Sequence, residues 1–206
     1  VNCLAGELRR LLPGIGQDFP VLTAGLGNRC MTADAVGPLA LENLLVTRHM
    51  VRALPRQFRG FTPVSALAPG VLAETGMETL ELLRGAVQAT GSAAVIAVDA
   101  LAARGRERLC ATVQLGDTGL IPGSGVGNHR KAINAQTLGV PVIAVGVPTV
   151  IAASLLEGET EDEDPLFLTP RDIDSRVREL GRVIGYGVTL AMQKGLSVED
   201  VTGLLG

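Results

Sequence analysis

Aromatic residues and positive charge are scarce in this sequence. It contains no Trp, one Tyr and four Phe among 206 residues, and its formal net charge is −3. Proteins that bind single-stranded nucleic acids stack the bases on aromatic side chains, and all nucleic acids require a cationic face for their phosphates. The composition therefore argues against direct binding of nucleic acid.

Long apolar runs and paired cysteines are also missing. No run reaches the roughly 18 apolar residues of a membrane span, and no basic segment leading into an apolar one marks the N-terminus. Cys3, Cys30 and Cys110 are too scattered for a disulfide framework or a metal-ligand pair. We therefore expect a soluble, intracellular protein that does not bind membranes.

What the sequence does have is enough apolar material for a core. Hydrophobic residues make up 47% of the chain, which suits a single domain over 1–206. Apolar, β-branched runs predict three buried parallel strands and a fourth strand near an edge. These runs lie at 20–25, 93–99 and 140–147, and the edge candidate is 109–115.

Apolar residues at helical spacing occur between and after these runs. This pattern predicts helices at 36–50, 76–90 and 170–193. Thr169 is expected to cap the last of these, and Ser197 with Asp200 to cap a final short helix. The acidic run 157–165 is expected to be a solvated linker. Alternating strands and helices predict a three-layer α/β fold with a mainly parallel central sheet.

Glycines and acidic residues follow each predicted strand. The segment 25–28 and then Asp34 follow the first strand, and Asp99 ends the second. Asp117 and the glycine run 123–127 follow the edge candidate. Open α/β sheets bind ligands beyond the carboxyl ends of their strands, where the loops converge. The sequence therefore predicts a functional site at this edge.

Asp34 and Asp99 are the candidates for a catalytic pair. Asp34 has a structural alternative, because an Asp near a helix start is often a cap. Asp99 ends an apolar strand, where an isolated carboxylate is costly to bury without a partner. If both reach one cleft, their repulsion raises one pKa, so that one is protonated while the other activates water.

Other residues near these strand ends are candidates for support or substrate binding. Asn28 lies in the first loop, and Asp117 either orients a catalytic carboxylate or bonds the amides of the glycine loop. His129 lies in a loop expected to be exposed and could contact an acidic substrate. Tight turns at glycines can also present amides to a substrate backbone or an oxyanion. These glycines are Gly123, Gly125 and Gly127.

Nucleotide and cysteine chemistry are less well supported. Gly25-Leu26-Gly27 begins like a dinucleotide fingerprint, but Cys30 stands at the third glycine position. The run 123–131 resembles a phosphate-binding loop, but Asn128 replaces the lysine. Cys30 as a nucleophile, with His49 or His129 as base, lacks any flanking signature. No cofactor is expected.

Several blocks of the sequence resemble the germination protease family, in the family's order. They are Gly25 to Asn28, Thr32 to Pro38, Glu42 to His49, Val64 to Gly70, Asp99 to Arg104, Asp117 to Gly119, Pro122 to Asn128 and Gly146 to Val150. The resemblance implies a spore endopeptidase that degrades small acid-soluble spore proteins during germination. It implies a zymogen, a homotetramer and a location in the cytoplasm of the forespore or spore core. The family's two proposed catalytic aspartates fall on Asp34 and Asp99.

The same resemblance implies the phosphorylase/hydrolase-like fold of the hydrogenase maturation peptidases. Those enzymes use two acids and a histidine as nickel ligands. Here His49 should lie a full helix away from Asp34, and Arg130 and Lys131 beside His129 disfavour a cation. We therefore expect a metal-free site. A non-catalytic sporulation protein of the same fold is the alternative, since a shared fold does not guarantee a shared activity.

Overall fold

Six strands form the centre of the molecule in the computed structural model, which describes residues 1–124, 130–157 and 166–205. The sheet order is β2-β1-β3-β5-β4, with β6 added to the end of β5. Strands β2, β1, β3 and β5 are parallel, whereas β4 and β6 run antiparallel to β5. The strands are β1 (Val21–Gly25), β2 (Val64–Leu67), β3 (Ala94–Ala103), β4 (Gln114–Gly116), β5 (Val142–Ala152) and β6 (Phe167–Leu168).

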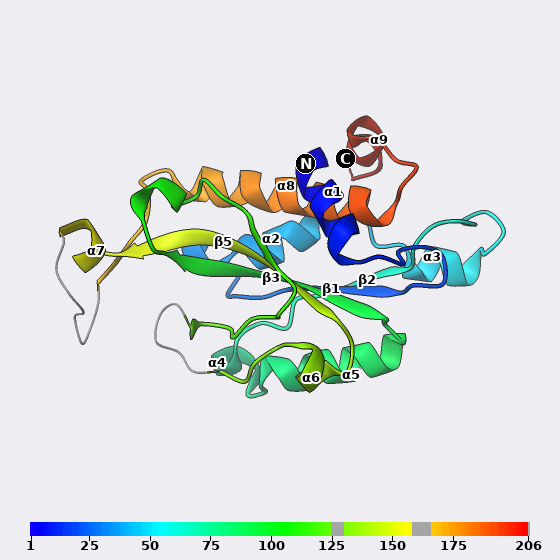
Figure 1. Cartoon of the computed structure of the whole chain (residues 1–206), viewed down its shortest axis with the longest axis horizontal. Helices are drawn as coiled ribbons and strands as arrows, with labels where there is room; N and C mark the ends of the chain where they lie inside the picture. The colour runs from blue at the N-terminus through cyan, green and yellow to red at the C-terminus, as the bar shows by residue number, and fades with distance from the viewer. Residues whose placement is uncertain (125–129, 158–165, 206) are drawn as a thin grey trace.

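Helices cover both faces of this sheet (Figure 1). One face carries α1 (Asn2–Leu11), α2 (Val36–Glu42), α8 (Ile173–Met192) and α9 (Val198–Leu205). The other carries α4 (Leu72–Thr75), α5 (Thr79–Thr90) and α6 (Ala135–Leu138). Beyond them, α3 (Arg48–Ala53) lies beside the start of β2, and α7 (Ser154–Glu157) follows β5. The predicted three-layer α/β fold with a mainly parallel sheet is confirmed.

The side chains of β3 point alternately to the two faces of the sheet and so contribute to the cores beneath both helical layers. Ala94, Ile96 and Val98 belong to the core beneath α1 and α8, whereas Val95 and Ala97 pack with α5. Successive side chains of a strand point to opposite faces, so the next odd-numbered position falls on the α5 face. This places the residue that follows Val98 on the same side of the sheet as α4 and α5.

The three predicted inner strands are confirmed, and β3 lies between β1 and β5. The edge candidate 109–115 is largely wrong, because only 114–116 forms a strand there, and it is antiparallel. Cys110 has a positive φ of 52°, and its N–H donates to Pro148 O at 2.7 Å. The chain turns at Cys110, and the strand that follows, β4, pairs with β5 in the antiparallel direction.

The predicted helix over 36–50 is also wrong, because it is interrupted at Asn43. The N–H of Leu45 donates to Thr189 Oγ1 at 3.0 Å, which draws the chain toward α8. The hydroxyl of Thr47 donates to Thr62 O at 2.6 Å and accepts from Val64 N at 2.9 Å. Hydrogen bonds with residues distant in sequence thus replace the helical hydrogen bonds of this segment.

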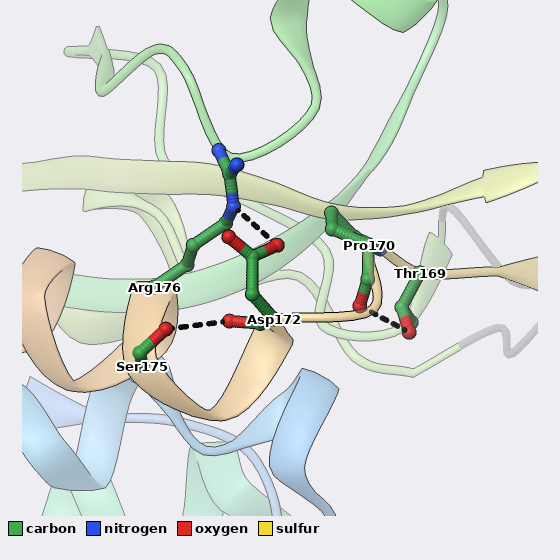
Figure 2. A network of polar contacts seen from close by, with 5 residues as sticks. All are labelled: Thr169, Pro170, Asp172, Ser175 and Arg176. Carbon is green, nitrogen blue, oxygen red and sulfur yellow. Dashed lines mark hydrogen bonds and ion pairs between the residues drawn. The ribbon is translucent and has the colours of Figure 1, made fainter.

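The start of α8 differs from the predicted cap at Thr169. The N–H of Ile173 donates to Pro170 O at 3.1 Å, and Asp172 is the residue that precedes the helix. The Asp172 carboxylate accepts from Arg176 Nε at 2.8 Å, and the Thr169 hydroxyl reaches only Pro170 O (Figure 2). The proline therefore shapes a turn ahead of the helix instead of its first turn.

The rest of the C-terminal region agrees with prediction. The apolar stripe of α8 enters the core through Val177, Ile184 and Val188. Ser197 Oγ donates to Asp200 Oδ2 at 2.8 Å, while Asp200 N donates to Ser197 Oγ at 3.1 Å, so α9 has its predicted cap. The acidic run 157–165 lies outside the described residues except for its first. No described helix is both long and apolar enough to cross a membrane.

The backbones of helices α2 and α8 are in direct contact. A Cβ on Gly185 would collide with the carbonyl oxygens of Ala40 and Asn43, and one on Gly181 would meet Leu39. Neither residue has φ in the left-handed region, so the requirement for glycine here is one of space. The two helices can pack this closely only because α8 has no side chains at these positions.

We expect Gly185→Ala to destabilise the protein by roughly 1–3 kcal/mol, because its methyl group must push α2 away. Gly85→Ala in α5 is the matched control, since nothing lies within 4 Å of the added carbon. It should stabilise by about 0.5–1 kcal/mol through helix propensity. Urea unfolding measures both, and equal effects of the same sign would contradict the close packing of α2 on α8.

Candidate active site

The loop after β1 brings Asp34 back to the end of that strand. The N–H of Leu26 donates to Val98 O at 2.8 Å, which holds the loop's beginning against β3. Gly27 then turns the chain with a φ of +103°, and a Cβ there would collide with the backbone oxygen of Asp34. The Asp34 carboxylate accepts from Asn28 N at 2.7 Å. Its position is thus set by the backbone of its own loop.

Asp99 lies on the central strand, on the α5 face, and is 5% exposed. Its carboxylate accepts one hydrogen bond, from the N–H of Ala100 at 3.0 Å. Burial raises the pKa of Asp99 to about 7, the nearby negative charge of Asp34 adds to this, and the Ala100 N–H opposes it. Near neutral pH this carboxyl can therefore gain or lose a proton.

Asp34 lies in a more exposed position than Asp99. Burial raises the pKa of Asp34 as well, and the hydrogen bond from the N–H of Asn28 opposes the shift. The two carboxyls influence each other, so their two protonation steps belong to the pair. The environment favours a state in which one carboxyl is ionised and the other is neutral.

Both aspartates line one cleft with a volume of about 270 Å³. It opens beyond the carboxyl ends of β1 and β2, beside the C-terminal parts of β3 and β5, which continue past Asp99 and Gly146. Its wall is largely apolar around the two carboxyls. The other lining residues are Leu26, Gly27, Met31, Ala33, Gly70, Val71, Leu72, Thr79, Ala100, Leu101, Ala102, Pro122, Gly123, Arg130, Thr149 and Val150.

The predicted supporting residues lie in different places. Asn28 shapes the loop, because its side-chain Oδ1 accepts from Cys30 N at 2.8 Å. Gly123 lines the cleft with a φ of +71°. Asp117 is exposed after β4 and does not line the cleft. The remaining three candidates lie outside the described residues: Gly125, Gly127 and His129.

A dyad of Cys30 and His49 is wrong. Cys30 is exposed in the loop beyond the carboxyl end of β1. His49 is exposed on α3, which begins beside the start of β2, where Thr47 N donates to Val64 O at 3.0 Å. Because β1 and β2 are parallel, Cys30 lies beyond the carboxyl end of this strand pair and His49 lies near its amino end.

Three parts of the cleft were missed from the sequence. The segment 70–72 lines it because β2, a short and half-exposed strand, ends just before it. The local signal in the sequence was the turn pair Pro69-Gly70, and Gly70 has a φ of 69° in the structure. Arg130 is the one cation among the described lining residues, and Thr149 forms part of the wall from β5.

Within the described ranges, no three His, Cys, Asp or Glu residues group closely enough to hold a metal ion. Asp34 and Asp99 supply two carboxylates, whereas a catalytic zinc site ordinarily has three protein ligands. The donor set of the described cleft therefore does not fit a resident metal.

Comparisons with known proteins agree with the sequence blocks that resemble the germination protease family. The model of the germination protease family matches residues 1–163. The chain is 52% identical over 188 residues to the germination protease of Bacillus subtilis (strain 168), covering 91% of this chain and 50% of the relative. It is 50% identical over 214 residues to that of Bacillus licheniformis, covering 98% and 55%.

Among solved structures, the [NiFe] hydrogenase maturation protease HycI from Thermococcus kodakarensis KOD1 aligns with a TM-score of 0.46 and 17% identity. The alignment covers 88% of this chain and 98% of that one. The chain spans about half the length of the curated relatives it matches. The match of the family model over most of the sequence shows that the chain belongs to the germination protease family.

Proposed function

We propose that this chain is an endopeptidase that initiates degradation of small acid-soluble spore proteins during spore germination, with Asp34 and Asp99 as its catalytic pair. The observation that supports it is the placement of both carboxyls in one cleft, with the pKa of Asp99 raised to about 7. Paired carboxyls whose environments separate their proton affinities are suited to acid and base roles on one substrate.

The environments favour one assignment of those roles. Asp34 accepts a backbone N–H and is more exposed, so it is the ionised base that takes a proton from water. The water oxygen then bonds to the peptide carbon. Asp99, buried and neutral, donates its proton to the carbonyl oxygen as negative charge develops there. Collapse of the tetrahedral intermediate breaks the C–N bond as the proton held by Asp34 passes to the leaving amine. One hydroxyl proton of the intermediate returns to Asp99 as the new carboxyl group forms, which restores the starting protonation of both aspartates.

The family's other properties extend to this chain as part of the same proposal. They are synthesis as a zymogen, a homo-oligomeric state and action in the forespore or spore core. A non-catalytic sporulation protein of the same fold remains the competing function. The raised pKa of Asp99 favours the enzyme, because a buried carboxyl in a cleft, with a second carboxyl nearby and no cation paired with it among the described residues, is typical of functional sites.

We expect Asp34→Asn and Asp99→Asn each to lower proteolysis at least about 100-fold, since neither amide can exchange a proton with the attacking water. The double variant should be hardly slower than either single one, because the two carboxyls act as a unit. Fragments of a small acid-soluble spore protein, followed on gels, provide the measurement. Cys30→Ala is the control and should cleave at the wild-type rate. Normal turnover by Asp99→Asn would refute the assignment.

Stability should also depend on pH through Asp99. Its pKa rises from 3.8 to about 7 on folding, so between these values the folded state holds a proton that the unfolded state releases. The free energy of unfolding therefore falls as the pH rises through this window, and above the window the whole of this decrease is present. Asp99→Asn removes the loss and should stabilise the protein by roughly 2–4 kcal/mol at pH 8.

At pH 4 the same substitution should change stability far less, because Asp99 is neutral in the folded form and only about half ionised in the unfolded form. Urea unfolding of the wild type and the variant at the two pH values gives the comparison. A variant that is no more stable than the wild type at pH 8 would show that Asp99 is not an unfavourable buried charge.

Proteolysis should survive chelator treatment, because the described cleft offers two carboxylates and no third acid, histidine or cysteine. The assay compares cleavage rates with and without EDTA. His129 lies outside the described residues, so His129→Ala is measured beside the wild type. Activity lost in chelator and restored by nickel or zinc would move the protein to the metal-dependent class.

A further inference from the structure

Thr149 carries a buried hydroxyl that the proposed mechanism does not use. The residue is 1% exposed on β5, and its Oγ1 has no hydrogen-bond partner among the described residues. Thr23 on β1 is the second buried hydroxyl of this kind in the described ranges. Buried polar groups are ordinarily paired, so each exception calls for a physical reason.

The two hydroxyls differ in their surroundings. Thr23 lies in a regular part of the sheet, opposite Ala66 on β2 and Ile96 on β3. Thr149 instead lies at an irregularity in the pairing of β3 with β5. Leu101 pairs with Pro148 and Ala102 with Val150, so Thr149 is the extra residue of a bulge. Bulges re-aim side chains and are common beside functional sites.

Thr149 also lines the cleft that contains both aspartates, and Thr23 does not. With so little of the residue exposed, a ligand can approach Thr149 only from that cleft. A rotation about χ1 moves a threonine hydroxyl between staggered positions, and an unpaired hydroxyl loses no hydrogen bond by turning. A ligand with a polar group at this depth would supply the missing partner.

The sheet register gives the displacement of Thr149 from Asp99 along the strands. Asp99 lies opposite Gly146, and Thr149 follows Gly146 by three residues. Because the bulge adds a residue to β5, Thr149 lies level with a point between Leu101 and Ala102 on β3. At about 3.3 Å per residue, this point is roughly 7–10 Å beyond Asp99. An extended polypeptide has a similar rise, so this displacement corresponds to about two to three residues of substrate.

We infer that Thr149 is a substrate-binding residue, whose hydroxyl forms a hydrogen bond with the main chain of a polypeptide about two to three residues from the scissile bond. The inference rests on the proposed function, because that function places the scissile bond at Asp34 and Asp99. A hydroxyl both donates and accepts, so it can pair with either an N–H or a C=O of the bound chain.

Thr149→Val, Thr149→Ser and Thr23→Val test this inference in an Asp99→Asn background, which should bind without cleaving. Fluorescence anisotropy measures binding of a labelled small acid-soluble spore protein. Thr149→Val should weaken binding roughly 3- to 10-fold, the effect of one hydrogen bond. Thr149→Ser keeps the hydroxyl and should bind normally. Thr23→Val removes the matched hydroxyl outside the cleft and should also bind normally.

Folding is measured separately by urea unfolding. Both valine variants should be as stable as their parent or more so, because each replaces an unpaired buried hydroxyl with a methyl group. In the active chain, Thr149→Val should raise KM and leave kcat and the pH profile unchanged. The difference should disappear with peptides shortened, on one side of the scissile bond, to fewer than about two residues.

Three outcomes would overturn the inference. The first is binding by Thr149→Val as tight as by Thr23→Val. The second is a defect that persists with peptides shortened at either end, and the third is a parent that binds none of the labelled protein. If the wild-type chain leaves small acid-soluble spore proteins intact, the proposed activity fails, while the binding comparison still decides the role of Thr149.

Discussion

The structure depends on the close contact of helix α2 with the sheet on one side and with α8 on the other. At the sheet, a Cβ on Gly25 would collide with the Gly37 backbone, and one on Gly37 with Leu26 and Val98. At α8, Gly185 lies equally close to the backbone of α2. The interior of a protein is packed like a crystal, so a helix held on both sides in this way has little freedom to shift.

This contact also determines the geometry of the candidate site. Asp34 ends the short 3-10 turn Thr32–Asp34, just before α2 begins, so a displacement of α2 would move its carboxyl. Asp99 is held independently by the central strand β3, whose neighbours on both sides are parallel strands. The two carboxyls therefore line one cleft because the start of a rigid helix is held beside the middle of a rigid strand. Their mutual repulsion, and the burial of Asp99, oppose folding and must be offset by the packing around them.

Much of the fold could be predicted from local sequence. Buried strands such as 93–99 are continuous apolar runs, and the stripe of α8 repeats at helical spacing. The errors fall where a distant segment competes with local preference. Thr189 and Thr62 take the chain out of helix after Asn43, although the sequence there continues a helical pattern. A strand as short and half-exposed as β2 has no local pattern strong enough to predict it.

The sequence by itself determined the fold class and predicted the two acidic residues, Asp34 and Asp99, that line one cleft of the structure. These follow from where apolar runs end, and that is a property of neighbouring residues. Only the tertiary structure decided that Asp99 titrates near neutral pH, that 70–72 and Arg130 share its cleft, and that Thr149 lies in its wall without a partner. Burial, charge proximity and unpaired polar atoms arise from contacts between segments far apart along the chain, so no local pattern carries them.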